Sequence, residues 1–115
     1  MDGKQLLAQL IVEFIGTFIF VTVILLATGS SKLIKGPASG LAGAFAIGIT
    51  LCAVIFFAGQ VSYGMFNPAV TLAQTIEGKL NWGGFAAYIT TQFVAALCAY
   101  YFYKYIYLNY TLPSD

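Results

Sequence analysis

The sequence lacks histidine and arginine altogether, and charged residues make up only 8% of its 115 positions. Five lysines against four acids give a net charge of +1, so there is no basic patch of the kind that binds nucleic acid. Without histidine, these acids cannot be assembled into an acid–base pair or a nucleophilic triad, and we expect the protein not to be an enzyme. The acidic residues are Asp2, Glu13, Glu77 and Asp115.

Cysteine is also scarce. Cys52 and Cys98 both fall within apolar segments and are far apart in the sequence. Their separation, together with the absence of histidine, leaves no plausible zinc cluster or redox pair. We therefore expect two buried free thiols, no bound metal and no other cofactor.

Hydrophobic residues, by contrast, make up 60% of the chain, which is the composition of a membrane protein. A helix needs roughly 20 apolar residues to cross a bilayer, and three segments are long enough. We expect an all-α, multi-pass integral membrane protein that forms a single membrane domain. Its predicted transmembrane helices span residues 6–28, 38–58 and 82–106.

Two of these spans carry further signals. A polar loop at residues 32–35 precedes the second span, in which Gly40, Ala44 and Gly48 recur every four residues and form one small-residue face. Such a face lets a neighbouring helix backbone approach closely, so we assign it to helix packing. The third span begins at Trp82 and ends among tyrosines, as expected for aromatic belts at the two membrane interfaces.

Residues 59–81 are too apolar for an ordinary loop, and too broken by Gly59, Gly64 and Pro68 for a span. We predict a re-entrant loop with a half-helix at residues 68–77 and Asn67 as its N-cap. A helix that begins at mid-membrane points unpaired N–H groups and the positive end of its dipole into the space it faces. That space would favour polar solutes and disfavour cations.

Three motifs occur in order along the chain: Glu13-Phe14-Ile15-Gly16-Thr17, Ala46-Ile47-Gly48-Ile49 and Asn67-Pro68-Ala69-Val70-Thr71-Leu72-Ala73. Together with Gln92 in the third span, this arrangement resembles the aquaporin and aquaglyceroporin family, also called the major intrinsic proteins. The resemblance runs from about Leu7 to Tyr103, but it matches only the amino-terminal half of a family member. It implies half of an aquaporin fold and a channel for water or small neutral solutes such as glycerol.

Family pores consist of two inverted repeats whose half-helices meet at the bilayer centre, and one copy cannot close such a pore. The simplest remedy is a homodimer of two antiparallel copies, and four such dimers would match the tetramers that family members form. The lysines permit either orientation. Lys4 and Lys79 would lie on one side of the membrane, with Lys32, Lys35 and Lys104 on the other, so the positive-inside bias is almost zero.

The resemblance also implies roles for particular residues. Asn67, in the motif with Pro68 and Ala69, would donate its amide to a passing solute at the pore centre. Glu13 and Gln92 resemble residues that hydrogen-bond the backbone of the re-entrant loop in this family.

The predicted mouth of the pore departs from the family pattern. In family members an arginine follows the second motif, whereas Val70 follows the motif present here. By spacing from Asn67, each mouth of a dimer would be apolar and uncharged, lined by Ile47 of one copy and by Ile55, Gly64 and Val70 of the other. Bulky side chains of the preceding segment would also lie near this entrance. They are Tyr63, Met65 and Phe66.

Two alternatives stay open at the level of sequence. An apolar mouth can dewet and slow water, or widen enough for glycerol. The second alternative is a non-conducting membrane protein that uses its helix faces for assembly, for instance as a regulatory partner of a full-length channel.

Overall fold

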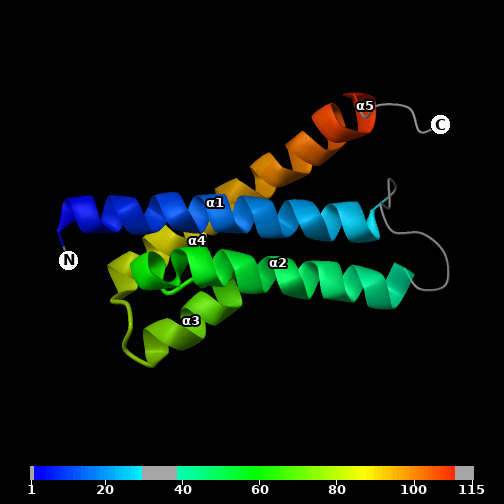
Figure 1. Cartoon of the computed structure of the whole chain (residues 1–115). Helices are drawn as coiled ribbons and strands as arrows, with labels where there is room; N and C mark the ends of the chain where they lie inside the picture. Colours follow the sequence, from blue (N-terminus) through cyan, green and yellow to red (C-terminus); the bar gives the residue numbers. More distant parts are fainter. Residues whose placement is uncertain (1, 30–38, 111–115) are drawn as a thin grey trace.

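The computed structural model describes residues 2–29 and 39–110, and in this part of the chain every regular element is helical (Figure 1). Three helices are long and apolar enough to cross a membrane, and α3 is too short to do so. The predicted fold class, three transmembrane helices with one short re-entrant helix, is therefore confirmed. The elements are α1 (Gly3–Thr28), α2 (Ser39–Ser62), α3 (Pro68–Ile76), α4 (Trp82–Tyr101), the π-helical segment η1 (Phe102–Tyr107) and α5 (Leu108–Tyr110).

Side-chain caps set the beginnings of the helices. The carboxylate of Asp2 accepts a hydrogen bond from the Gln5 N–H at 2.7 Å, so α1 begins at Gly3, ahead of the predicted span. Asn81 caps α4 in the same way. The α2 helix continues to Ser62, beyond the predicted end at residue 58, and α4 continues through η1 to residue 110. The predicted polar loop at residues 32–35 and the predicted start at residue 38 lie outside the described residues.

The α1 helix is the centre of the bundle. It packs against α2 on one side and against α4 on the other, whereas α3 packs against α4 (Figure 1). The rings of Phe18 and Phe102 meet edge to face, with their centroids 5.7 Å apart, and join the start of η1 to α1. A Cβ added to Gly29 would overlap the hydroxyl of Tyr103, so the end of α1 also approaches η1 closely.

Several polar side chains are buried in the bundle, and many large apolar side chains are exposed on its outside. Glu13, Ser62 and Gln92 are buried, while large apolar side chains such as Phe56 are exposed on the chain taken alone. A membrane protein shows this pattern because its outer surface faces lipid or other apolar helices. The sequence prediction of buried thiols is wrong for the single chain, since both Cys52 and Cys98 lie on this outer surface as free cysteines.

Candidate functional site

The chain reverses direction between α2 and α3 through a short segment of unusual backbone conformation. Tyr63, Gly64 and Phe66 have φ angles of 70°, 61° and 55°. Only glycine adopts such left-handed angles freely, and other residues lose about 1–3 kcal/mol there unless neighbouring contacts hold them. The segment therefore requires a support, and we name residues 63–67 the re-entrant segment.

Glu13 of α1 supplies that support with both of its carboxylate oxygens. Oε2 accepts hydrogen bonds from the Ser62 hydroxyl at 2.7 Å and from the Met65 N–H at 2.9 Å. Oε1 accepts from the Phe66 N–H at 2.8 Å and from the Gln92 amide at 2.9 Å. A fully buried carboxyl group is thus surrounded by four donors from α2, the re-entrant segment and α4.

Gln92 extends this network to α3. Its Nε2 also donates to the Thr71 hydroxyl at 2.8 Å, and that hydroxyl lies 2.8 Å from the carbonyl oxygen of Asn67, to which it donates. The sequence prediction for Gln92 was a bond to the loop backbone. The structure instead shows bonds to two side chains, Glu13 and Thr71, which link α1 to the first turn of α3.

Sequence reasoning missed three members of the network: Ser62, Thr71 and Tyr88. The Tyr88 hydroxyl donates to the Ser62 carbonyl at 3.0 Å, and the Ser62 hydroxyl lies 3.2 Å from the Gly64 N–H. Helical spacing could have found two of them. Tyr88 lies four residues before Gln92, and Thr71 four residues after Asn67, so each shares a helix face with a predicted residue.

The re-entrant segment reaches the depth of the middle of α1. Glu13 lies ten residues after Gly3 in this 26-residue helix, or roughly 15 Å along its axis. The Phe66 ring lies against Gly16, where an added Cβ would overlap it, and is buried with Val54 and Ala58. Irregular backbone is tolerated at membrane depth only where it is buried in protein or lines a water-filled cavity.

One side of the re-entrant segment is left with unused hydrogen-bonding groups. Glu13 and Ser62 accept hydrogen bonds from the N–H groups of residues 64–66, but no described residue donates to the carbonyl oxygens of residues 63–66. Asn67 is exposed, and its Oδ1 caps α3 by accepting from the Ala69 N–H at 2.8 Å. Its Nδ2 has no partner among the described residues. The site thus offers a row of acceptors followed by an amide donor.

The structure places the predicted mouth residues as follows. Gly64 lies beside Ile55, because a Cβ added to Gly64 would be 3.3 Å from the Ile55 Cα. Val70 and Ile55 are exposed, and Ile47 on α2 is half-buried. Among the described residues, α3, which carries Val70, does not pack against α2, which carries Ile47 and Ile55.

Two of the three bulky side chains predicted to lie near the entrance are instead buried in the protein. Met65 packs into a buried cluster with Leu80 and Tyr88, and Phe66 packs against α1 and α2. The hydrogen bonds of both N–H groups to Glu13 fix the backbone so that these side chains point into the protein. Tyr63 remains half exposed.

The small-residue face of α2 points away from the rest of the chain. Gly40, Ala44 and Gly48 are exposed, and a Cβ added to either glycine would meet nothing within 4 Å. The packing role predicted for this face therefore requires another molecule. Within the chain, α2 meets α1 through Gly43, which approaches Ala27.

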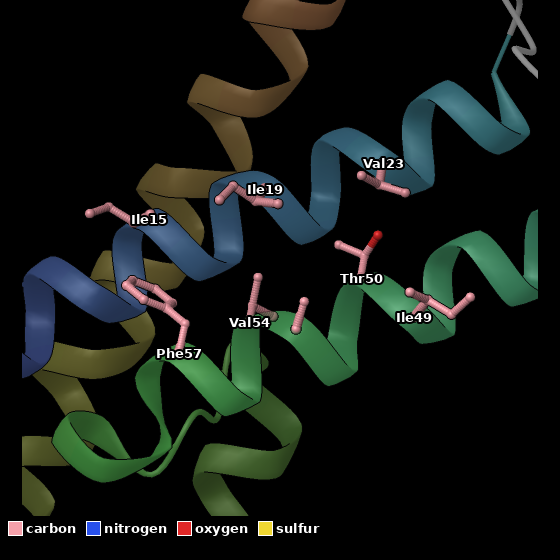
Figure 2. A pocket seen from close by; sticks show the side chains of 8 residues that line it. Ile15, Ile19, Val23, Ile49, Thr50, Val54 and Phe57 are labelled. Carbon is pink, nitrogen blue, oxygen red and sulfur yellow. The ribbon is translucent and has the colours of Figure 1, made fainter.

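An apolar groove runs between α1 and α2 (Figure 2). Figure 2 shows the side chains of Ile15 and Ile19 above those of Val54 and Phe57. The one hydroxyl in the groove, that of Thr50, donates to the Ala46 carbonyl of its own helix at 2.7 Å. The groove thus offers no free polar group, and none of the predicted pore residues lines it. No cluster of metal-binding residues occurs among residues 2–29 and 39–110.

Three membrane-length helices and a re-entrant half-helix define an integral, multi-pass membrane protein. A family model described as Major intrinsic protein matches residues 1–114. The chain therefore belongs to the major intrinsic protein family, and the resemblance to aquaporins and aquaglyceroporins is confirmed.

Similar proteins come from bacteria, fungi and animals. Glycerol uptake facilitator protein-like 6 of Lactiplantibacillus plantarum is 37% identical over 87 residues, which cover 76% of this chain and 38% of that protein. Aquaglyceroporin-2 of Rhizophagus irregularis is 38% identical over 103 residues, which cover 89% of this chain and 31% of that protein. Aquaporin-10 of Homo sapiens is 35% identical over 105 residues, which cover 84% of this chain and 33% of that protein. The chain thus spans about a third of the length of these relatives. No solved structure matches it significantly.

Proposed function

We propose that this chain forms a passive membrane channel for water and small neutral solutes such as glycerol. The observation that carries the proposal is the set of unpaired groups on the re-entrant segment. The carbonyl oxygens of residues 63–66 and the Asn67 amide have no partner among the described residues, although they lie level with the middle of a membrane-length helix. Water or a hydroxyl-bearing solute would satisfy them in passing.

The same geometry favours neutral solutes over cations. The α3 helix begins at Pro68 with Asn67 as its cap, so its positive end points toward the space that these groups face. Cations would be repelled there, whereas water and glycerol can both donate to the carbonyl oxygens and accept from Asn67. The names of two similar proteins, a glycerol uptake facilitator and an aquaglyceroporin, support glycerol as a candidate solute.

We propose that the pore forms between two antiparallel copies of the chain. The α3 helix contacts no long helix but α4 among the described residues, and this leaves its outer face uncovered. A second, inverted copy would place its own α3 opposite, so that two Asn67 amides face the solute. The mouths would then carry Ile47, Ile55, Gly64 and Val70, and four such dimers could assemble further. The exposed residues of α3 are Ala69, Val70, Leu72, Ala73 and Ile76.

Reconstituted liposomes test the channel. The purified chain would be inserted into vesicles, and their volume followed by stopped-flow light scattering after osmotic shock with sucrose or glycerol. We expect faster water efflux after the sucrose shock, or faster glycerol entry after the glycerol shock, than in empty vesicles. Val70→Trp should abolish the increase, because Val70 is exposed at the start of α3 and an indole there would fill the proposed pore.

Leu72→Trp is the matched control. Leu72 is equally exposed on the same short helix, but it lies on the opposite flank from Val70 relative to the face that packs on α4. It should leave permeation intact. No increase for the unmodified chain, with its oligomer shown intact in detergent, would overturn the channel and favour the non-conducting assembly protein.

Orientation tests the antiparallel arrangement. A single cysteine placed by Glu77→Cys, with Cys52→Ala and Cys98→Ala, would be exposed in the turn after α3. A membrane-impermeant maleimide should label about half of the chains from outside the vesicle. Labelling of nearly all or nearly none would contradict two opposed copies, because half-helices that enter from one side cannot meet tip to tip.

A further inference from the structure

The side chain of Lys79 lies at the outer end of the re-entrant segment, although the sequence predicted an uncharged mouth. Tyr63 is the first residue of this segment, and its ring is half exposed, whereas Met65 and Phe66 point into the protein. The Nζ atom of Lys79 lies over that ring, 5.6 Å from its centroid. This distance is within the range of a cation–π interaction.

The turn that follows α3 fixes the position of Lys79. Its N–H donates to the Gln74 carbonyl at 2.9 Å, and the Gly78 N–H donates to the Thr75 carbonyl at 3.0 Å. Gly78 has a φ of 104°, a left-handed conformation that a residue with a side chain rarely adopts. The backbone on both sides of the contact is therefore ordered, and the ammonium group stands between the end of α3 and the start of the re-entrant segment.

The local charges explain why a cation is needed at this place. The carboxyl end of α3 carries about half a negative charge from the helix dipole, and Glu77 adds a full one in the same turn. No ion pair joins Lys79 to any carboxylate in the described parts of the chain. Without Lys79, this surface would attract cations. With it, the net charge of the turn changes from about −1.5 to about −0.5 elementary charges, so the attraction for cations is weakened about threefold.

We infer that Lys79, positioned by the Tyr63 ring, is a specificity-determining residue that lowers the attraction of cations to each mouth of the pore. This inference rests on the proposed function, because an antiparallel dimer would place one such pair at each entrance. The α3 dipole acts at the centre of the pore, where its positive end lies. Lys79 acts at the opposite end of the same helix, where the dipole alone would have the wrong sign for excluding cations.

The test compares two fluxes in the same vesicles. Glycerol entry is followed by light scattering, and potassium entry by an entrapped fluorescent indicator, first at low and then at high ionic strength. Lys79→Gln should leave glycerol entry unchanged and raise potassium entry about fivefold, the effect of one unit charge acting over about 4 Å in water. The increase should shrink at about 1 M salt, where charges are screened within about 3 Å.

Matched variants separate charge from structure. Lys104→Gln removes an equal charge that also lies over tyrosine rings, those of Tyr100 and Tyr105, but near the far end of α4, and it should leave potassium entry unchanged. Tyr63→Phe keeps the ring and should behave as the unmodified chain, whereas Tyr63→Leu should raise potassium entry. Adding Glu77→Gln to Lys79→Gln should restore exclusion, because it removes the excess negative charge.

Each outcome decides a different point. Normal glycerol entry with unchanged potassium entry in Lys79→Gln would overturn the role of Lys79 and leave the channel standing. An increase that does not depend on salt, or that Glu77→Gln fails to reverse, would also overturn it, because a structural defect would then be the cause. No glycerol or water entry through the unmodified chain would overturn the channel, and the inference with it.

Discussion

The two flanks of α1 differ in the contacts they make, since one is held by hydrogen bonds and the other is apolar. Toward α4 and the re-entrant segment, the helix buries Glu13 and Thr17, and the Glu13 carboxylate accepts four hydrogen bonds. Toward the groove shared with α2, it presents Ile15 and Ile19, which are 41% and 40% exposed in the single chain. Directional polar contacts thus hold the irregular backbone in one geometry, while the apolar flank has no such constraint and can meet lipid or another helix.

Removing the polar acceptor should have the largest effect. Glu13→Leu would leave the buried N–H groups of Met65 and Phe66, and one of the two N–H groups of the Gln92 amide, without an acceptor. At about 1–3 kcal/mol for each unsatisfied group, the free energy of unfolding should fall by about 3 kcal/mol or more. Thermal unfolding in detergent, followed by circular dichroism, would measure it.

The apolar flank supplies the control for this comparison. Ile15→Leu exchanges one half-exposed apolar side chain for another, and it should change the free energy of unfolding by less than about 0.5 kcal/mol. Equal losses for Ile15→Leu and Glu13→Leu would show that the two flanks are not distinct.

Disturbing the close contact between Gly16 and the Phe66 ring should have the next largest effect on the free energy of unfolding. In Gly16→Ala, the new methyl group would overlap the Phe66 ring, which Val54 and Ala58 prevent from moving away. Overpacking of this kind costs about 1–3 kcal/mol. Gly59→Ala, at a glycine with open space around it, should instead be neutral or stabilising, so a loss there equal to that of Gly16→Ala would contradict the packing argument.

A single hydrogen bond at the edge of the network should matter less. Tyr88→Phe removes the bond to the Ser62 carbonyl and keeps the buried ring, so the loss should be about 1 kcal/mol. The same unfolding measurement would detect it, with Tyr105→Phe at an exposed ring as the control. An unchanged midpoint for Tyr88→Phe would show that the carbonyl finds another donor.

The outward face of α2 should give the smallest effect on the folding of one chain. Gly48→Leu meets open space, so the free energy of unfolding should change by no more than about 1 kcal/mol, in the stabilising direction that leucine's helix propensity predicts. If Gly40, Ala44 and Gly48 form the packing face between copies, the same change should break the oligomer. Light scattering coupled to size-exclusion chromatography in detergent would show this, and an intact oligomer would contradict the assignment.

Apolar length and one helix-start motif were enough to predict the fold class. The three long segments specified the transmembrane helices, and Asn67 followed by Pro68 specified the start of α3, because these signals are local in the sequence. Helix ends were less predictable. Gly59 was read as a break, but α2 continues until Tyr63 takes a left-handed φ, a conformation that hydrogen bonds to residues from other helices make possible.

The candidate site could be predicted only where single residues stood out. Glu13 was conspicuous as a lone acid in an apolar helix, whereas Ser62 and Tyr88 resemble ordinary membrane-helix residues. The inward direction of Met65 and Phe66 depends on hydrogen bonds that span 52 and 53 residues of chain, and the contact of Lys79 with Tyr63 depends on the turn after α3. Such long-range geometry has no periodic signature in the sequence.

The position of Glu13 in the chain has a consequence for biogenesis. Its donors follow it by 49 to 79 residues, so α1 is synthesised long before any of them. An acidic residue at the centre of an inserting helix costs about 2.5–3.5 kcal/mol, which the surrounding leucines, isoleucines and phenylalanines of α1 must offset. Until α4 has been synthesised and delivers Gln92, the carboxyl group lacks its full set of donors. The α4 helix, which is synthesised well after α1, thus completes the polar environment of the Glu13 carboxyl group.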